Sequence, residues 1–353
     1  MKQDAFNQQE YGLDFFKLIA SLFVVGMHTE FLRDLNELAY VIADHLFRFA
    51  VPFFFMCSGY LFEKHRFYNK KDMQSYIKKY IKNLFFPFVI WGGIYAIIDV
   101  VGDVIIDSVE LNTAIISKLH QVVTESPGGG MWYIYALIWM MVILYLFYDN
   151  RKWISYISLI IFFGILFFLR PIWKLSVFEG TFISEIKKVY NSIFVSELTF
   201  LFHMFFLLIG ILLAKNMEKC KKIRRNNLIL ALFIFYALYY SVGLFQESVL
   251  GVFFYQVLRV IITSTFFLLS LTITRNKYIN GDTCVKMRKM STIIYFTHFL
   301  VIYGIRFWCK VCGINYYNHL TVVCIICWII LSLYAFYIVD NKYVKKMVDF
   351  LYP

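Results

Sequence analysis

Charged side chains are scarce in this chain of 353 residues, at 16% of the total. A soluble globular domain carries about 25% charged residues. The deficit extends along the whole sequence, and 60% of the residues are hydrophobic. This composition excludes an ordinary soluble protein. It indicates an all-α, polytopic bundle of helices in a lipid bilayer, because helices satisfy their own backbone hydrogen bonds there.

Three other features are missing. No cleavage site of small residues follows the first apolar run, so we expect that run to remain as an anchor. No long polar linker separates the apolar runs, so we predict one membrane-embedded domain over residues 1–353, without a separate soluble domain. No convincing internal repeat is present, which weakens the case for a transporter built from inverted halves.

Metal and nucleic-acid sites are not indicated either. Two Cys-x-x-Cys pairs, Cys309–Cys312 and Cys324–Cys327, resemble zinc-ligand spacing. The second pair lies inside an apolar run, so we interpret these cysteines as small apolar residues and predict no metal. The net charge of +12 comes from basic residues in short loops. That placement is typical of membrane topology, so we expect no nucleic-acid partner.

Ten apolar runs approach the roughly 20 residues that a helix needs to cross the bilayer core. They cover approximately residues 12–29, 38–62, 84–106, 131–149, 153–171, 197–214, 228–246, 251–273, 291–309 and 319–340. Most of the 35 lysines and arginines fall in alternate loops, which predicts that both termini are cytoplasmic. We expect a multi-pass protein of a bacterial plasma membrane.

The first run carries a polar stripe. Lys17 and His28 are eleven residues apart, so they share one face of a helix and are separated by roughly 16 Å along its axis. Asp14 and Ser21 fall near the same line. Ionisable groups inside a membrane usually face the bundle interior or a wet cavity. Two simpler interpretations stay open: Asp14 and Lys17 form an i, i+3 ion pair, and His28 is only interfacial.

Five motifs occur in order along the chain. Residues 13–28, LDFFKLIASLFVVGMH, place a basic residue, ten others and then a histidine. The others are FAVPFFFMCSGYLF at 49–62, MWYIYALI at 131–138, FFLLIGILLA at 205–214 and STIIYFTHFLV at 291–301. In this series the chain resembles the acyltransferase-3 family of integral membrane acyltransferases, and the resemblance covers most of the sequence.

The resemblance implies transfer of an acyl group, usually acetyl, from cytoplasmic acetyl-CoA to a sugar hydroxyl on the external side. It implies His28 as the catalytic residue. Its neutral imidazole would act as general base. Lys17, Lys79 and Lys82 would bind the phosphates of acetyl-CoA. Lys79 and Lys82 replace the arginine pair more usual in the family, and Lys78 is an alternative to Lys79. An ordinary basic loop also explains these lysines.

Further polar residues fall within the predicted spans, and we assign no roles among them: Asp14, Arg48, Tyr133, Glu197, His203, Arg259 and His298. For Arg48 and Arg259, snorkelling or a structural ion pair is an equal alternative.

The rival function is a transporter or exporter of a saccharide or amino acid, since some relatives of this domain accompany a racemase or export polysaccharide. The acceptor and a homo-oligomeric state stay open, and the external segments 103–130 and 172–196 are expected to shape acceptor choice.

Overall fold

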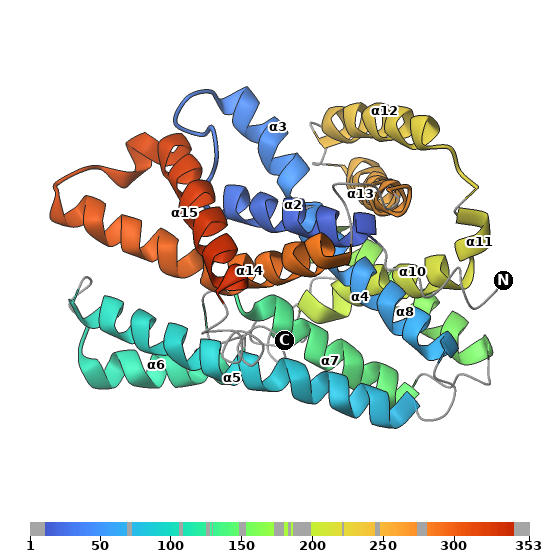
Figure 1. The fold of residues 1–353 in the computed structure, drawn as a ribbon, viewed down its shortest axis with the longest axis horizontal. Coiled ribbons are helices and arrows are strands. Elements are labelled where there is room, and N and C mark those ends of the chain that lie inside the picture. The colour runs from blue at the N-terminus through green and yellow to red at the C-terminus, as the bar shows by residue number, and fades with distance from the viewer. Residues whose placement is uncertain are drawn as a thin grey trace.

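The computed structural model is a bundle of α-helices (Figure 1). It describes residues 11–68, 73–105, 109–124, 128, 130–147, 153–172, 180–182, 185, 199–220, 222–243, 248–273 and 281–341. Within these ranges there are helices, turns and irregular segments but no strand, so the all-α prediction is confirmed.

The first half of the chain forms these helices: α2 (Tyr11–His28), α3 (Glu37–Phe47), α4 (Ala50–Tyr68), α5 (Met73–Ile105), α6 (Leu111–Thr124), α7 (Trp132–Phe147) and α8 (Trp153–Ile172). The second half forms α10 (Thr199–Lys215), α11 (Met217–Cys220), α12 (Arg225–Gly243), α13 (Val249–Leu271), α14 (Gly281–Val311), the 3₁₀ turn η2 (Tyr316–His319) and α15 (Leu320–Asp340).

Among the described residues, seven helical stretches are long and apolar enough to cross a membrane. Three shorter apolar helices, Trp132–Phe147, Tyr156–Phe168 and Phe202–Lys215, lie where the sequence predicts the fourth, fifth and sixth spans. Each of the ten predicted runs therefore contains a helix. The chain has the architecture of a multi-pass membrane protein.

The second predicted run, 38–62, is divided into two helices. α3 ends at Phe47 and α4 begins at Ala50, with Arg48 and Phe49 in a turn. Pro52 lies in the first turn of α4, where its missing N–H costs little. Its ring would clash with the carbonyl of Arg48 if the helix continued through the turn, so Pro52 accounts for the break.

Two helices begin well before the apolar runs that predicted them. α5 spans 33 residues from Met73, and α14 spans 31 residues from Gly281. Basic residues that the sequence assigned to loops, such as Lys79, Lys82 and Arg288, therefore lie on rigid helices. Pro87 lies inside α5, where it cannot donate a hydrogen bond to the carbonyl of Asn83.

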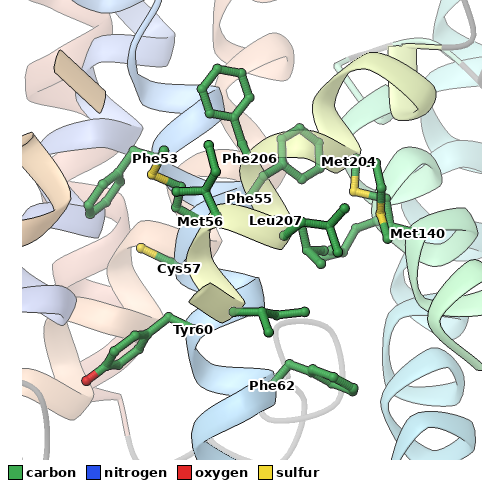
Figure 2. Close-up of a cluster of buried hydrophobic side chains, with 14 of the residues drawn as sticks. Phe53, Phe55, Met56, Cys57, Tyr60, Phe62, Met140, Met204, Phe206 and Leu207 are labelled. Carbon is green, nitrogen blue, oxygen red and sulfur yellow. The ribbon is translucent and has the colours of Figure 1, made fainter. Parts of the chain in front are cut away.

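The core is densest where α4 crosses α10. Figure 2 shows Met56 and Cys57 of α4 beside Phe206 and Leu207 of α10, in a cluster of fully buried side chains. Glycines permit this approach from both sides. A Cβ on Gly59 would lie 2.8 Å from the carbonyl carbon of Leu207, and one on Gly210 would lie 2.9 Å from that of Met56. The Ser58-Gly59 and Gly210 motifs thus have a packing role.

Candidate functional site

A cavity of about 230 Å³ opens between α2, α4, α5, α7 and α14. It contains Lys17 and His28 together, so the shared helix face predicted from their spacing is present in the structure. Two further candidates from the sequence, Tyr133 and His298, line the same cavity. Its other polar lining residues are Ser58, Tyr80, Asn83, Arg288, Ser291, Thr292 and Tyr295.

One end of the cavity holds two imidazoles. The ring centroids of His28 and His298 are 5.5 Å apart, and the ring of Phe299 lies within 4.6 Å of both. α14 packs along α2, which brings the C-terminal end of α2 against the middle of α14. The structure therefore places a second histidine beside the one that the first motif singles out.

The tautomer of His298 follows from its partners. Its Nδ1 lies 2.6 Å from the carbonyl oxygen of Tyr295 and 3.2 Å from that of Ile294. Carbonyl oxygens only accept hydrogen bonds, so Nδ1 carries the proton. Nε2 then bears the lone pair, and this atom is buried without a hydrogen-bond partner among the described residues. A basic nitrogen is thus held in a fixed orientation beside the cavity.

Two cations line the cavity toward the N-terminal ends of α2 and α14. They are Lys17 and Arg288, and the Ser291 hydroxyl donates to the Lys17 carbonyl at 3.0 Å, which fixes the two helices in register.

Arg288 was missed because it was read as a loop residue. Its spacing to Ser291, Tyr295 and His298, three or four residues at each step, is that of a helical stripe and could have identified it.

Hydroxyl groups lie between these two ends. The Ser58 Oγ and Tyr133 Oη atoms are 3.4 Å apart, and the Ser58 hydroxyl donates to the Phe54 carbonyl at 3.0 Å. The Tyr295 hydroxyl donates to the Gly130 carbonyl at 2.8 Å. The wall therefore offers both donors and acceptors to a polar ligand between the imidazoles and the cations.

The other predicted candidates do not line this cavity. Arg48 is exposed and pairs with Asp44 at 2.5 Å, in agreement with a structural ion pair. His203 is buried on α10, and Arg259 on α13 lies 5.8 Å from the centre of the Phe206 ring. Glu197 lies outside the described residues.

The lysine pair and Asp14 also lie apart from the cavity lining. Lys79 and Lys82 are exposed on α5, next to the lining residues Tyr80 and Asn83. Asp14 is buried on α2 and, unlike Lys17, does not line the cavity.

Metal ligands are not gathered in the part of the chain that the structure describes. No group of three His, Cys, Asp or Glu side chains is placed to hold an ion there. Cys309, Cys312, Cys324 and Cys327 are free thiols, and three of them are buried.

A family model described as an acyltransferase domain matches residues 10–338, nearly the whole chain. An amino-acid racemase from Enterococcus faecalis is 35% identical over 74 residues, which are 21% of this chain and 10% of that protein. The chain thus covers only a small part of this relative. No solved structure matches.

Proposed function

Because the chain belongs to the acyltransferase-3 family of integral membrane acyltransferases, we propose that it moves an acyl group, acetyl by default, from acyl-CoA to a hydroxyl of a saccharide. The donor would enter from the side that the basic loops assign to the cytoplasm, and the acceptor from the opposite side. The product would be an O-acetylated glycan of the cell envelope.

The cavity suits the reactive end of the donor. Its volume of about 230 Å³ is below the roughly 300–1,000 Å³ of pockets that enclose drug-sized ligands. We therefore place the acyl thioester and part of the pantetheine arm inside it, with the nucleotide beyond Lys17 and Arg288. A guanidinium binds phosphate with two parallel hydrogen bonds. Exposed Lys79 and Lys82 would add charge outside the cavity.

The imidazole pair supplies the proton transfer. His28 takes the proton of the acceptor hydroxyl as its oxygen attacks the thioester carbonyl. The new C–O bond forms, the C–S bond breaks, and the proton passes from His28 to the departing thiolate of CoA. Nε2 of His298 can accept a hydrogen bond from His28 after a small rotation of either ring, which would orient His28 as a base.

One observation carries this assignment: the buried, unpartnered Nε2 lone pair of His298 beside His28 in a cavity that ends in two cations. Most buried polar atoms in proteins have a hydrogen-bond partner, so an unpartnered ring nitrogen beside a cavity points to a ligand or a proton donor there. A lone pair held next to a second imidazole is the arrangement that positions a base for proton transfer.

The test uses purified full-length protein with labelled acetyl-CoA, and measures released CoA and acetyl transfer to saccharides of the producing cell. His28→Ala is expected to lower turnover by about 10²–10⁴-fold, the usual contribution of a general base. His298→Ala should lower kcat less, and His319→Ala, which removes an exposed histidine, should leave it unchanged. Full activity of His28→Ala would refute the assignment.

The rival function gives a different result in the same material. Uptake of a saccharide or amino acid into vesicles, with no dependence on acetyl-CoA, would favour a transporter. If turnover survives in His28→Ala but is lost in His298→Ala, then His298 is the general base and His28 the residue that orients it.

A further inference from the structure

A second concavity lies at the other end of the imidazole pair. Its volume is about 800 Å³, and it is lined by the C-terminal parts of α5 and α14, by α6 and by η2. We call it the outer groove. In Figure 1, α6 lies alongside the C-terminal part of α5. The sequence predicted a loop over residues 103–130, so α6 and this groove are findings of the structure.

The floor of the outer groove is a built polar site. The Lys118 ammonium donates to the Asp99 carboxylate and, at 2.8 Å, to Oε1 of Gln121. Lys118 is only 7% exposed. Burying an ammonium group is costly unless it is paired and hydrogen-bonded, so this arrangement is fixed in place. A ligand in the groove would meet a rigid row of donors and acceptors.

Its rim on α14 carries two cations, Arg306 and Lys310, one helical turn apart. The Arg306 guanidinium lies 4.8 Å from the centre of the Tyr316 ring. In the described part of the chain, neither cation pairs with a carboxylate within 4 Å. The lining holds three basic residues, Lys118, Arg306 and Lys310, and two carboxylates, Asp99 and Asp103. The groove therefore has a net charge of +1.

Aromatic rings complete the lining, namely Tyr303, Phe307 and Tyr317. An aromatic face with a few fixed polar groups is the usual composition of a small-molecule site. Planar rings that carry a polar tip bind a ligand with both apolar and hydroxyl surfaces. Sugar rings have this character, and the unpaired cations select a sugar that carries an acid.

Two glycines, Gly128 and Gly130, lie between the outer groove and the reaction cavity. Gly128 lies against the Asp99–Lys118 pair: a Cβ there would be 2.8 Å from the Lys118 Nζ atom. Two residues later, a Cβ on Gly130 would be 3.5 Å from Cε1 of His298. The groove and the imidazoles thus lie on either side of Gly128 and Gly130.

The geometry points to the outer groove as the binding site of the acyl acceptor, and to a saccharide bearing a carboxylate or phosphate as its ligand. The acid would lie between Arg306 and Lys310, and the sugar ring would extend over Tyr303 toward His28. This inference rests on the proposed function, because it assumes that the acceptor approaches the imidazoles from the side opposite the donor cations.

The test measures the function of the outer groove separately from that of the reaction cavity. The double variant Arg306→Ala/Lys310→Ala is compared with Arg306→Lys/Lys310→Arg, which keeps the charges, and with Arg224→Ala/Arg225→Ala, which removes two exposed cations near the start of α12. Each full-length protein is measured twice. Purified protein is assayed for acetyl-CoA hydrolysis without acceptor, and producing cells for alkali-labile acetate on their saccharides, which are then separated by anion exchange.

The first double variant is expected to lower saccharide-bound acetate at least tenfold, with acetyl-CoA hydrolysis within twofold of wild type. The two control variants should retain both signals, and the acetylated material should bind the anion exchanger. The inference would be overturned if Arg306→Ala/Lys310→Ala left saccharide-bound acetate unchanged, or if it lowered acetyl-CoA hydrolysis as much as saccharide-bound acetate. It would also be overturned if the acetylated saccharides of wild-type cells did not bind the anion exchanger. A wild-type protein that shows neither signal would remove the proposed function, and the acceptor site with it.

Discussion

Replacement of Gly210 by alanine tests the helix crossing that supports the reaction cavity. A Cβ at this position would lie 2.9 Å from the carbonyl carbon and 3.0 Å from the Cα atom of Met56, and closer still to its carbonyl oxygen. Favourable contacts between carbon atoms lie at about 3.5–4.0 Å. Since the obstacle is backbone rather than a flexible side chain, α4 and α10 must move apart by roughly 1 Å.

The expected loss follows from two opposing effects. Overpacking a core costs about 1–3 kcal/mol, and we take the upper end because a whole helix must shift. Alanine is favoured over glycine inside a helix by about 1 kcal/mol. Gly93→Ala on α5 supplies the matched control, because nothing lies within 4 Å of a Cβ there. Relative to this control, Gly210→Ala should lose about 3 kcal/mol.

Thermal unfolding in detergent, followed by tryptophan fluorescence, measures the difference. A loss of 1 kcal/mol lowers the midpoint by about 2–4 °C in domains of 150–250 residues. This chain is longer, so we use the lower value of about 2 °C per kcal/mol. A loss of about 3 kcal/mol then predicts that Gly210→Ala unfolds about 6 °C below Gly93→Ala. Acetyl-CoA turnover should also fall, because Ser58 lies beside Gly59 at the same crossing and lines the cavity.

Equal midpoints for the two variants would refute the close crossing of α4 and α10. A lower midpoint for Gly93→Ala would refute it as well, since that position offers open space. The double variant Gly59→Ala/Gly210→Ala adds a check: both glycines serve one crossing, so their effects should be less than additive.

Three further predictions concern the site. Arg288→Ala should raise KM for acetyl-CoA about tenfold with little change in kcat, whereas Lys219→Ala on α11 should change neither; a fall in kcat alone would contradict a role in donor binding. Lys118→Met should lower the unfolding midpoint by more than the double variant Lys118→Met/Asp99→Asn, because the single change leaves a carboxylate without its partner. EDTA should leave acetyl-CoA turnover unchanged, and a loss restored by zinc would show that a metal site exists.

The helices in the ten apolar runs and the first part of the site could be predicted from sequence, because both depend on local periodicity, whereas α6 lies in a segment predicted as a loop. Apolar runs gave the positions of the helices, and the eleven-residue spacing placed Lys17 and His28 on one face. Both signals come from a single helix. Neither requires knowledge of which helices are neighbours in space.

The remaining features depend on tertiary contacts. The nearness of His298 to His28 requires the packing of α14 on α2. The tautomer of His298 follows from two carbonyls whose positions no pattern of residues gives. Arg288 is a partial exception, since its helical stripe was visible, but its basic surroundings resemble a loop. The burial of Asp14 outside the cavity lining also depends on neighbouring helices, because spacing within a helix does not say which side chain a neighbour covers.

α14 carries residues of all three parts of the proposed reaction. Arg288 lies at the donor end, His298 at the imidazoles and Arg306 in the outer groove, so roughly 15 Å and 12 Å of straight helix set their separations. One residue inserted between His298 and Arg306 would rotate Arg306 and the rest of α14 by about 100° around the helix axis. Arg288 and His298 would stay in place. Chimeric proteins joined just after Phe299 should therefore exchange the groove residues of α14 and η2, and with them the preference for an acidic acceptor, while keeping the same donor.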